Sequence, residues 1–175
     1  MRKALIFITL LISTLSFGQN REQDQFSFGF HLNRIQDEFG FGIGILSPEL
    51  KFVQISAKGN INWLNHLDEE GLETWSECAS FQLGLRTHNQ VADRIALYAE
   101  GGGIGLLPNS DFSSSSFEVG GYGLFGFEFY LTEGIKRNPC YFIEIGGAGL
   151  GARADKLLSE PIYANGFLVV VGYRF

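Results

Sequence analysis

The sequence predicts an all-β fold, an eight-stranded antiparallel up-and-down transmembrane β-barrel. Three observations lead to this prediction: short runs in which apolar residues alternate with small or polar ones, turn residues between the runs, and a final run that ends on an aromatic residue. Successive side chains of a strand point to opposite faces, so each run can offer one face to lipid and one to a lumen. The 23 glycines and 17 phenylalanines among 175 residues suit a curved, closed sheet with an aromatic exterior.

The first 18 residues have the pattern of a secretory signal peptide. Arg2 and Lys3 give a basic start, and residues 4–15 form an apolar run that is too short to span a bilayer as a helix. Cleavage is expected after Gly18, which leaves residues 19–175 as the barrel domain. The alternative interpretation is a buried amino-terminal helix.

The first half of the chain contains four predicted strands. In residues 26–33 and 39–45, large apolar residues alternate with glycine and polar residues, and in residues 53–63 an apolar face is opposed by a polar one. Residues 65–77 are expected to form a long polar loop, and residues 81–86 form the fourth strand. The two tryptophans that flank this loop are expected at the level of the outer lipid headgroups.

The second half contains the other four strands, at residues 94–107, 117–131, 141–148 and 162–175. Four of the five residues from 101 to 105 are glycine, so a bulge or a close contact between strands is expected there. The serines at 113–116 are expected to form a flexible loop tip. An even number of strands places both ends of the chain on the same side of the membrane.

The last strand shows the alternation most clearly. One of its faces is large and apolar and consists of Phe167, Val169, Val171, Tyr173 and Phe175, whereas the other face is small and mixed and ends in a charge. This strand resembles the closing strand of bacterial outer-membrane β-barrels, whose terminal aromatic residue is read by the barrel insertion machinery. The resemblance implies that these five residues form the insertion signal.

The signal peptide, the strand pattern and the closing GFLVVVGYRF together resemble the small bacterial outer-membrane β-barrel family of the OmpA and OmpX types, in its Bacteroidota-like form. The resemblance covers roughly the whole mature chain and includes no catalytic motif. It implies a location in the outer membrane of a Gram-negative bacterium. The implied partners are outer-membrane lipid, the barrel insertion machinery and an unidentified extracellular partner.

Several charged side chains are expected to face the lumen. They are Glu100, Glu128 and Glu144, together with Lys58, Arg86, Arg174, Arg94 and His31. An eight-stranded barrel is only wide enough for side chains to fill it, so buried charges must pair with one another. We interpret them as a structural ion network that fills the lumen. A gated pore or a proton site is the alternative.

The two cysteines are expected to remain unpaired thiols. Cys78 is predicted near the outer end of the fourth strand, and Cys140 near the opposite end of the seventh. Because the strands between these ends cross the bilayer, the two sulfur atoms should lie beyond disulfide reach.

No catalytic, cofactor or metal site is predicted. His66, with Ser76 or Ser80 and with Glu77, comes closest to a nucleophile and base, but no motif joins these residues. The acidic residues between positions 68 and 73 could hold a calcium ion, yet their spacing does not match an EF-hand, and a solvated loop is the simpler interpretation. The formal net charge of −6 argues against nucleic acid as a partner.

These observations favour a structural, adhesive or surface-interaction protein that acts through its outer loops and has no enzymatic activity. One alternative is a barrel enzyme that modifies outer-membrane lipid. Another is a soluble periplasmic barrel that binds an apolar ligand, which would require the phenylalanine faces to point inward.

Overall fold

The computed structural model describes residues 25–36, 38–67, 71–131, 139–157 and 162–175. The predicted signal peptide, residues 1–18, lies outside these described residues. The strands are β1 (Ser27–Ile35), β2 (Glu38–Leu46), β3 (Gln54–Leu67), β4 (Glu73–Ala92), β5 (Ile95–Leu107), β6 (Glu118–Tyr130), β7 (Cys140–Arg153) and β8 (Ile162–Arg174). In the part of the chain that is described, no helix is long and apolar enough to cross a membrane.

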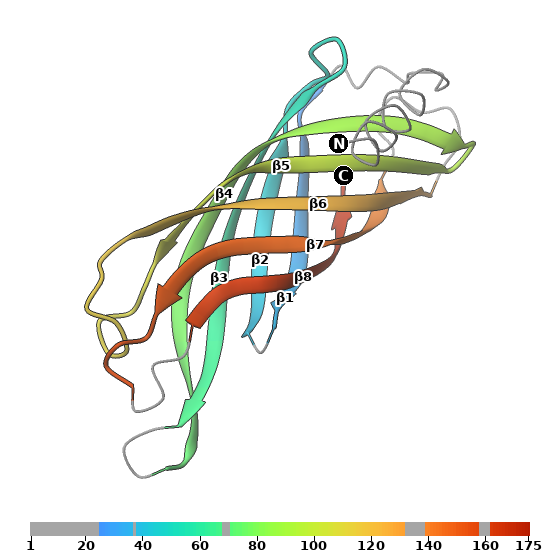
Figure 1. Cartoon of the computed structure of the whole chain (residues 1–175). Coiled ribbons are helices and arrows are strands. Elements are labelled where there is room, and N and C mark those ends of the chain that lie inside the picture. The colour runs from blue at the N-terminus through green and yellow to red at the C-terminus, as the bar shows by residue number, and fades with distance from the viewer. Residues whose placement is uncertain (1–24, 37, 68–70, 132–138, 158–161) are drawn as a thin grey trace, which may run out of the picture.

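The strands form a closed barrel in which each one pairs antiparallel with the next along the chain (Figure 1). Pairing of β8 with β1, from Gly29 to Ile35 of β1, completes the closure. The backbone of Phe175 continues this pairing, with hydrogen bonds of 2.8 and 3.0 Å to the backbone of Phe28. The predicted fold class, an eight-stranded antiparallel barrel, is therefore confirmed.

Burial alternates along the strands as predicted. In β6, Phe125, Phe127 and Phe129 are exposed, whereas Leu124 and Glu128 on the other face are buried. The outward apolar side chains form a band around the barrel, which we call the apolar belt. The belt consists of Phe28, Phe30, Leu32, Phe39, Phe41, Ile43, Ile45, Ile55, Ile61, Phe81, Leu83, Leu85, Phe125, Phe127, Phe129, Tyr141, Ile143, Ile145, Phe167 and Val171.

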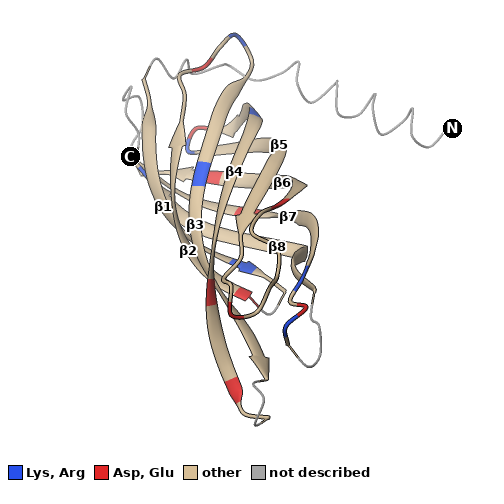
Figure 2. Cartoon of the chain, turned by 90° about the vertical axis from the view of Figure 1, so that its left-hand side faces the viewer, with Lys and Arg blue, Asp and Glu red and all other residues tan. Residues whose placement is uncertain are grey.

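The orientation of the phenylalanines contradicts a barrel with an apolar lumen for a ligand. That interpretation required their rings to point inward, but Phe41, Phe81 and Phe127 are each about half exposed on the outer surface. Figure 2 shows long uncharged stretches along the strands, with few bands of acidic or basic residues. The outside of the barrel is apolar, and the ionised side chains of its middle section point inward.

Several strands are longer than predicted. β3 continues to Leu67 and β4 begins at Glu73, so the predicted loop 65–77 is largely a hairpin. β4 also continues to Ala92 and leaves only a two-residue turn before β5, and β7 continues to Arg153. The added ends of β3 and β4 carry polar residues on both faces, and the added end of β7 is a run of glycine, leucine and alanine before Arg153. The alternation on which the prediction relied is therefore lost there.

The glycines of β5 make a close contact between strands and not a bulge. The pairing of β5 with both neighbours is unbroken across residues 101–103. A Cβ atom on Gly102 would lie 2.1 Å from the carbonyl oxygen of Leu83 on β4, a separation that no side chain could tolerate. Glycine at this position therefore lets the two backbones approach.

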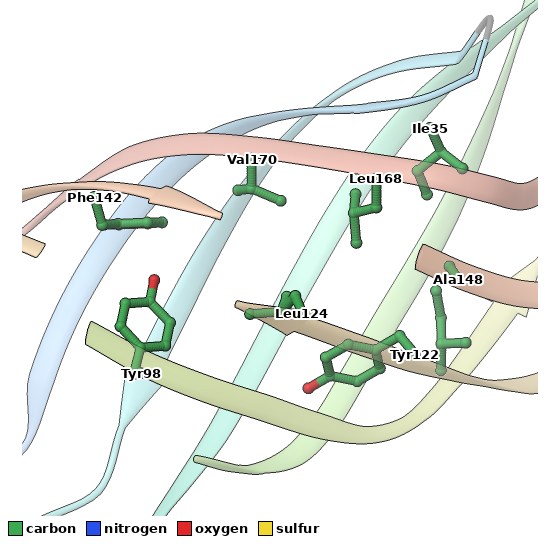
Figure 3. Close-up of a cluster of buried hydrophobic side chains, with 9 residues drawn as sticks. Ile35, Tyr98, Tyr122, Leu124, Phe142, Ala148, Leu168 and Val170 are labelled. Atoms are coloured by element: carbon green, nitrogen blue, oxygen red, sulfur yellow. The ribbon is translucent and has the colours of Figure 1, made fainter. Parts of the chain in front are cut away.

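Large side chains fill the interior, and inward-facing glycines make room for them. Figure 3 shows tyrosine, phenylalanine and aliphatic side chains of several strands converging inside the barrel. A Cβ atom on Gly126 would lie 2.2 Å from the ring of Tyr98, and one on Gly172 would lie 2.4 Å from the ring of Phe142. In each case the glycine is the direct cross-strand neighbour of the aromatic residue. Glycine on one strand and a ring on the next thus occupy one layer of the core.

Candidate functional site

The first charged group in the lumen joins three alternate strands. Arg86 of β4 and Arg174 of β8 both donate hydrogen bonds to Oε1 of Glu128 on β6. The Tyr130 hydroxyl donates to the other oxygen of Glu128 at 2.6 Å. Because β4 and β8 lie four places apart in the ring of eight, the two arginines come from opposite walls. Glu128 therefore ties both walls to a strand midway between them.

The second charged group has the reverse arrangement, with one cation between two carboxylates. Lys58 of β3 lies 2.8 Å from Oε2 of Glu144 on β7, and its ammonium lies 3.0 Å from Oε1 of Glu100 on β5. The Tyr98 hydroxyl donates to Glu144 at 2.8 Å, and the Tyr122 hydroxyl donates to Glu100 at 2.9 Å. This group also spans the lumen, since β3 and β7 are opposite in the ring.

Tyr98 lies between the two groups and contacts both. The guanidinium of Arg86 is 3.5 Å above the centre of its ring, and its hydroxyl binds Glu144. A cation over the face of a tyrosine ring is attracted by the ring, and this attraction is larger when the cation is desolvated. Arg86, Glu128 and Glu144 are all 0% exposed, so these contacts replace solvation almost entirely.

Each predicted lumen glutamate thus contacts at least one cation: Glu128 contacts two arginines, and Glu100 and Glu144 share Lys58. The register pairs Glu128 with Phe142 and Glu144 with Gly126, so the two carboxylates are offset by two residues along their strands. Three glutamates and three basic residues give these six side chains a formal charge of zero. Sequence reasoning placed the six residues in the lumen but did not identify which pairs meet across it. Arg94 was expected to point inward too, but it is exposed in the turn between β4 and β5.

A ladder of polar side chains continues the lumen toward the end of the barrel that carries the β3–β4 hairpin and the loop between β5 and β6, which we call the outer end. His31 and Asn60 are hydrogen-bonded at 2.7 Å, and the Asn33 amide donates to the same Asn60 oxygen at 3.2 Å. Asn60 and Asn62 both donate to the hydroxyl of Ser80, at 3.3 and 3.1 Å. A small cavity, of about 10 Å³, lies beside His31 near the opposite end of the barrel and has room for a single water molecule.

The outer mouth of the barrel is closed by a side chain from the loop between β5 and β6. Phe112 is 0% exposed and meets the ring of Tyr163 edge to face, with 5.2 Å between the ring centres. The pocket that holds it is built mainly from small or aliphatic side chains. The other buried residues of this cluster are Leu64, Cys78, Leu106, Ala152, Ala154 and Ala164.

The same loop is fastened to the residues that follow β7. The Ser113 hydroxyl donates to the carbonyl of Arg153 at 3.1 Å, and the backbone N–H of Lys156 donates to the carbonyl of Phe112 at 3.1 Å. Ser114 donates to the Asp155 carboxylate from its hydroxyl and, at 2.7 Å, from its backbone N–H. These hydrogen bonds hold the pKa of the exposed Asp155 carboxyl below its ordinary range.

The expectation of a flexible serine tip at residues 113–116 was therefore wrong for the first part of this loop, where Ser113 is buried and Ser114 is bonded. Consecutive serines resemble a linker in sequence, because their small side chains need no core. The signal that could have corrected the prediction is Phe112, a large apolar ring in an otherwise polar segment, because burial of such a ring is favourable.

The residues considered for catalysis separate into different places. His66 Nε2 lies 2.8 Å from Ser76 Oγ, but Glu77 lies on the opposite face of β4, because side chains alternate along a strand. Ser80 belongs to the asparagine ladder. His66 and Ser76 share the face of their hairpin on which Leu64 and Cys78 point inward, away from the apolar belt. A site that acts on membrane lipid would need the other face.

Neither a metal cluster nor a disulfide is found in the described ranges. No group of three or more His, Cys, Asp or Glu side chains there could hold a metal ion. Three of the four acidic residues considered for calcium, at positions 68–70, lie outside the described residues, and Glu73 is exposed on β4. Cys78 and Cys140 are both buried free thiols, at opposite ends of the barrel, which confirms that they are unpaired.

The residues of the predicted insertion signal lie on the outer face of β8. Phe167, Val171 and Phe175 are exposed, and Val169 and Tyr173 are half-buried against neighbouring strands. Tyr173 packs between the ring of Phe30 on β1 and the ring of Tyr141 on β7. Its ring centre lies 5.8 Å from that of Phe30 and 5.2 Å from that of Tyr141. That the insertion machinery reads these residues remains a prediction.

A closed eight-stranded barrel with an apolar exterior and a filled, charged interior is the architecture of outer-membrane β-barrel proteins. Among solved structures, the chain is similar to the N-terminal β-barrel domain of OprF from Pseudomonas aeruginosa, with a TM-score of 0.57 and 12% sequence identity. The match covers 89% of this chain and 98% of that one. No protein-family model matches the chain, and no curated protein matches it in sequence. At this identity the likeness establishes the fold alone.

Proposed function

We propose that this protein resides in the outer membrane of a Gram-negative bacterium and acts there, without enzymatic activity, as a structural or surface-interaction protein. Residues 1–18 would direct its export through the general secretory route, and the outer face of β8 would be read by the barrel insertion machinery. On the pattern of that closing strand, we place it with the OmpA- and OmpX-type barrels in their Bacteroidota-like form. It would need no cofactor.

The apolar belt is the observation that carries the proposed location. Soluble monomers rarely expose apolar patches of more than a few hundred Å², whereas this barrel exposes large apolar residues along most of its strands. Closure of the sheet also pairs the strand edges through the middle of the barrel, as hydrocarbon requires of any backbone inside it. Outer-membrane lipid is the environment that suits both the exposed apolar residues and the closed pairing of the strands.

The filled lumen supports a structural role over conduction. Side chains from opposite walls meet across it in two places, at Glu128 and at Lys58, and aromatic rings occupy the space between. Phe112 covers the outer mouth. With the interior occupied in this way, interactions with other molecules fall to the outer loops.

The experiment that tests the location and the fold together is membrane fractionation followed by gel electrophoresis with and without boiling. We expect the protein in the outer-membrane fraction, with a mobility that changes on boiling because the folded barrel resists the detergent of the gel. A protein that is recovered in the periplasmic fraction, or whose mobility is the same before and after boiling, would contradict the proposal.

A further inference from the structure

The hairpin between β3 and β4 extends beyond the rest of the barrel and has two open edges. β2 pairs with β3 only as far as Trp63, and β5 pairs with β4 only from Ala79 onward. In the described part of the chain, residues 64–67 therefore pair only with residues 73–76, and residues 77 and 78 pair only with Trp63 and Asn62 of β3. Figures 1 and 2 both show this hairpin projecting past the neighbouring loops. We call residues 64–67 and 73–78 the outer hairpin.

The edge of β4 in the outer hairpin is protected only by the charges of two glutamates, Glu73 and Glu77, and not by proline, lysine or a bulge. Residues 73–78 contain neither proline nor lysine, and the register with β3 is unbroken along them. An open edge presents backbone N–H and C=O groups that an additional extended segment can pair with. Six residues give it about the length of an ordinary strand.

The side chains on that edge select the charge of what can pair with it. Glu73, Trp75 and Glu77 alternate with inward residues, so they form one outward row, and all three are exposed. A strand added beside this row would bring its own outward side chains within about 5 Å of it. Lysine or arginine there could pair with a carboxylate and stack on the indole ring.

A second copy of this chain does not fit the same edge. Antiparallel pairing of two β4 edges would bring glutamates of the two copies together, and like charges directly opposite one another destabilise a pair of strands. We therefore infer that the outer hairpin binds an extended, lysine- or arginine-rich segment of another protein, which adds as a strand beside Glu73, Trp75 and Glu77. This inference rests on the proposed surface-interaction role and names the class of partner.

The test uses the full mature barrel refolded in vesicles of zwitterionic phosphatidylcholine, so that the lipid itself does not attract a basic probe. The probe is a fluorescent peptide of alternating lysine and threonine, and its binding is followed by anisotropy at low salt. Two control peptides have the same length: one alternates glutamate with threonine, and the other has the basic sequence with methylated backbone nitrogens, which removes the N–H donors and keeps the charge.

We expect saturable binding of the basic peptide only. The double variant Glu73→Gln, Glu77→Gln should weaken it roughly threefold to tenfold, the effect of losing two exposed ion pairs, and Trp75→Ala should weaken it as well. The matched control is Asp111→Asn, Glu118→Gln, which changes the net charge equally at the same end of the barrel but outside the hairpin. This control should bind the peptide as the unchanged protein does.

Four results would overturn the inference, and the first three are no binding of the basic peptide, equal weakening by both double variants, and equal binding of the methylated peptide. The second would mean general attraction to an acidic protein, and the third would mean that no strand is added. If Trp75→Ala changes insertion into the vesicles and leaves peptide binding unchanged, Trp75 is a lipid-headgroup anchor and the inference also fails. The gel assay on the same samples reports separately whether the barrel itself is folded.

Discussion

Glu128 is a single carboxylate on which two arginines from opposite walls of the barrel depend. Its own charge is held by both guanidinium groups and by the Tyr130 hydroxyl, in a place with no access to water. A buried ion pair of this kind adds little stability when compared with well-packed apolar side chains in its place. Removal of one partner, however, leaves the other charge buried without a counter-charge. A substitution that removes the charge of Glu128 should therefore lower the stability of the barrel strongly.

We expect Glu128→Gln to lower the free energy of unfolding by on the order of 3 kcal/mol, because Arg86 and Arg174 would then face each other without a counter-charge. Glu144→Gln should also destabilise the barrel, since it removes one of the two carboxylates that hold Lys58. The measurement is urea unfolding of the refolded barrel in detergent micelles. Glu77→Gln, at an exposed position, serves as the control and should leave the midpoint unchanged. Unaltered unfolding of both lumen variants would show that the network does not stabilise the fold.

Which way each of these side chains points could be predicted from the sequence, whereas its partner could not. Alternation with a period of two places Lys58, Arg86 and Glu128 on the inner face of their strands. The pairs, however, form between strands that are not neighbours in the ring, such as β3 with β7. Their meeting depends on the length of each side chain and on the space left by inward glycines, which no periodic pattern encodes.

At the scale of the elements, prediction succeeded within the apolar belt and failed at strand ends on both sides of it, in the outer hairpin and at the end of β4 near Ala92. Within the belt, one face of each strand meets an apolar surrounding and the other a filled lumen, so the sequence must alternate. Beyond it, in the outer hairpin, both faces mix polar and apolar residues, and Asn65, His66 and Ser76 have the composition of a loop although they lie in strands. The backbone pairing of the outer hairpin extends regardless of this composition.

The loop between β5 and β6 allows a test of how its parts hold together. We expect Phe112→Ala to open the outer mouth and expose the thiol of Cys78, which lies in the same cluster and is 3% exposed. The change should also cost about 3 kcal/mol of stability, as is usual when a buried phenylalanine is truncated. The measurement is the rate of maleimide labelling of Cys78 under native conditions, in a background in which Cys140 is replaced by serine.

Phe117→Ala is the matched control for this experiment. Phe117 follows the same loop, but its ring is exposed and stacks on Phe81 outside the barrel, with 6.0 Å between the ring centres. Labelling of Cys78 should remain slow in this variant. If Phe112→Ala and Phe117→Ala label at the same slow rate, the outer mouth is closed by something other than the Phe112 ring.

At the scale of the whole molecule, the two faces of the sheet meet different surroundings. The inward face excludes water by filling the lumen with paired charges, tyrosines and aliphatic groups, and the outward face presents the apolar belt. A soluble protein arranges these surfaces the other way round, with ionised groups outside. The medium around the belt should therefore determine how much a charge on the outer face lowers the free energy of unfolding.

We expect the cost of an added arginine to depend on its depth along the barrel. Ile143 lies in the middle of the belt, paired with Phe127 and Val171, and Ile143→Arg should destabilise the barrel by about 2–4 kcal/mol in lipid vesicles. Leu67, at the end of β3 in the outer hairpin, is similarly exposed, yet Leu67→Arg should cost only about 0–1 kcal/mol because it lies in water or at the membrane interface. Urea unfolding from the vesicles measures both. Equal costs at the two positions would mean that hydrocarbon does not surround the belt, since an exposed leucine and an exposed isoleucine differ here only in their distance from the membrane centre.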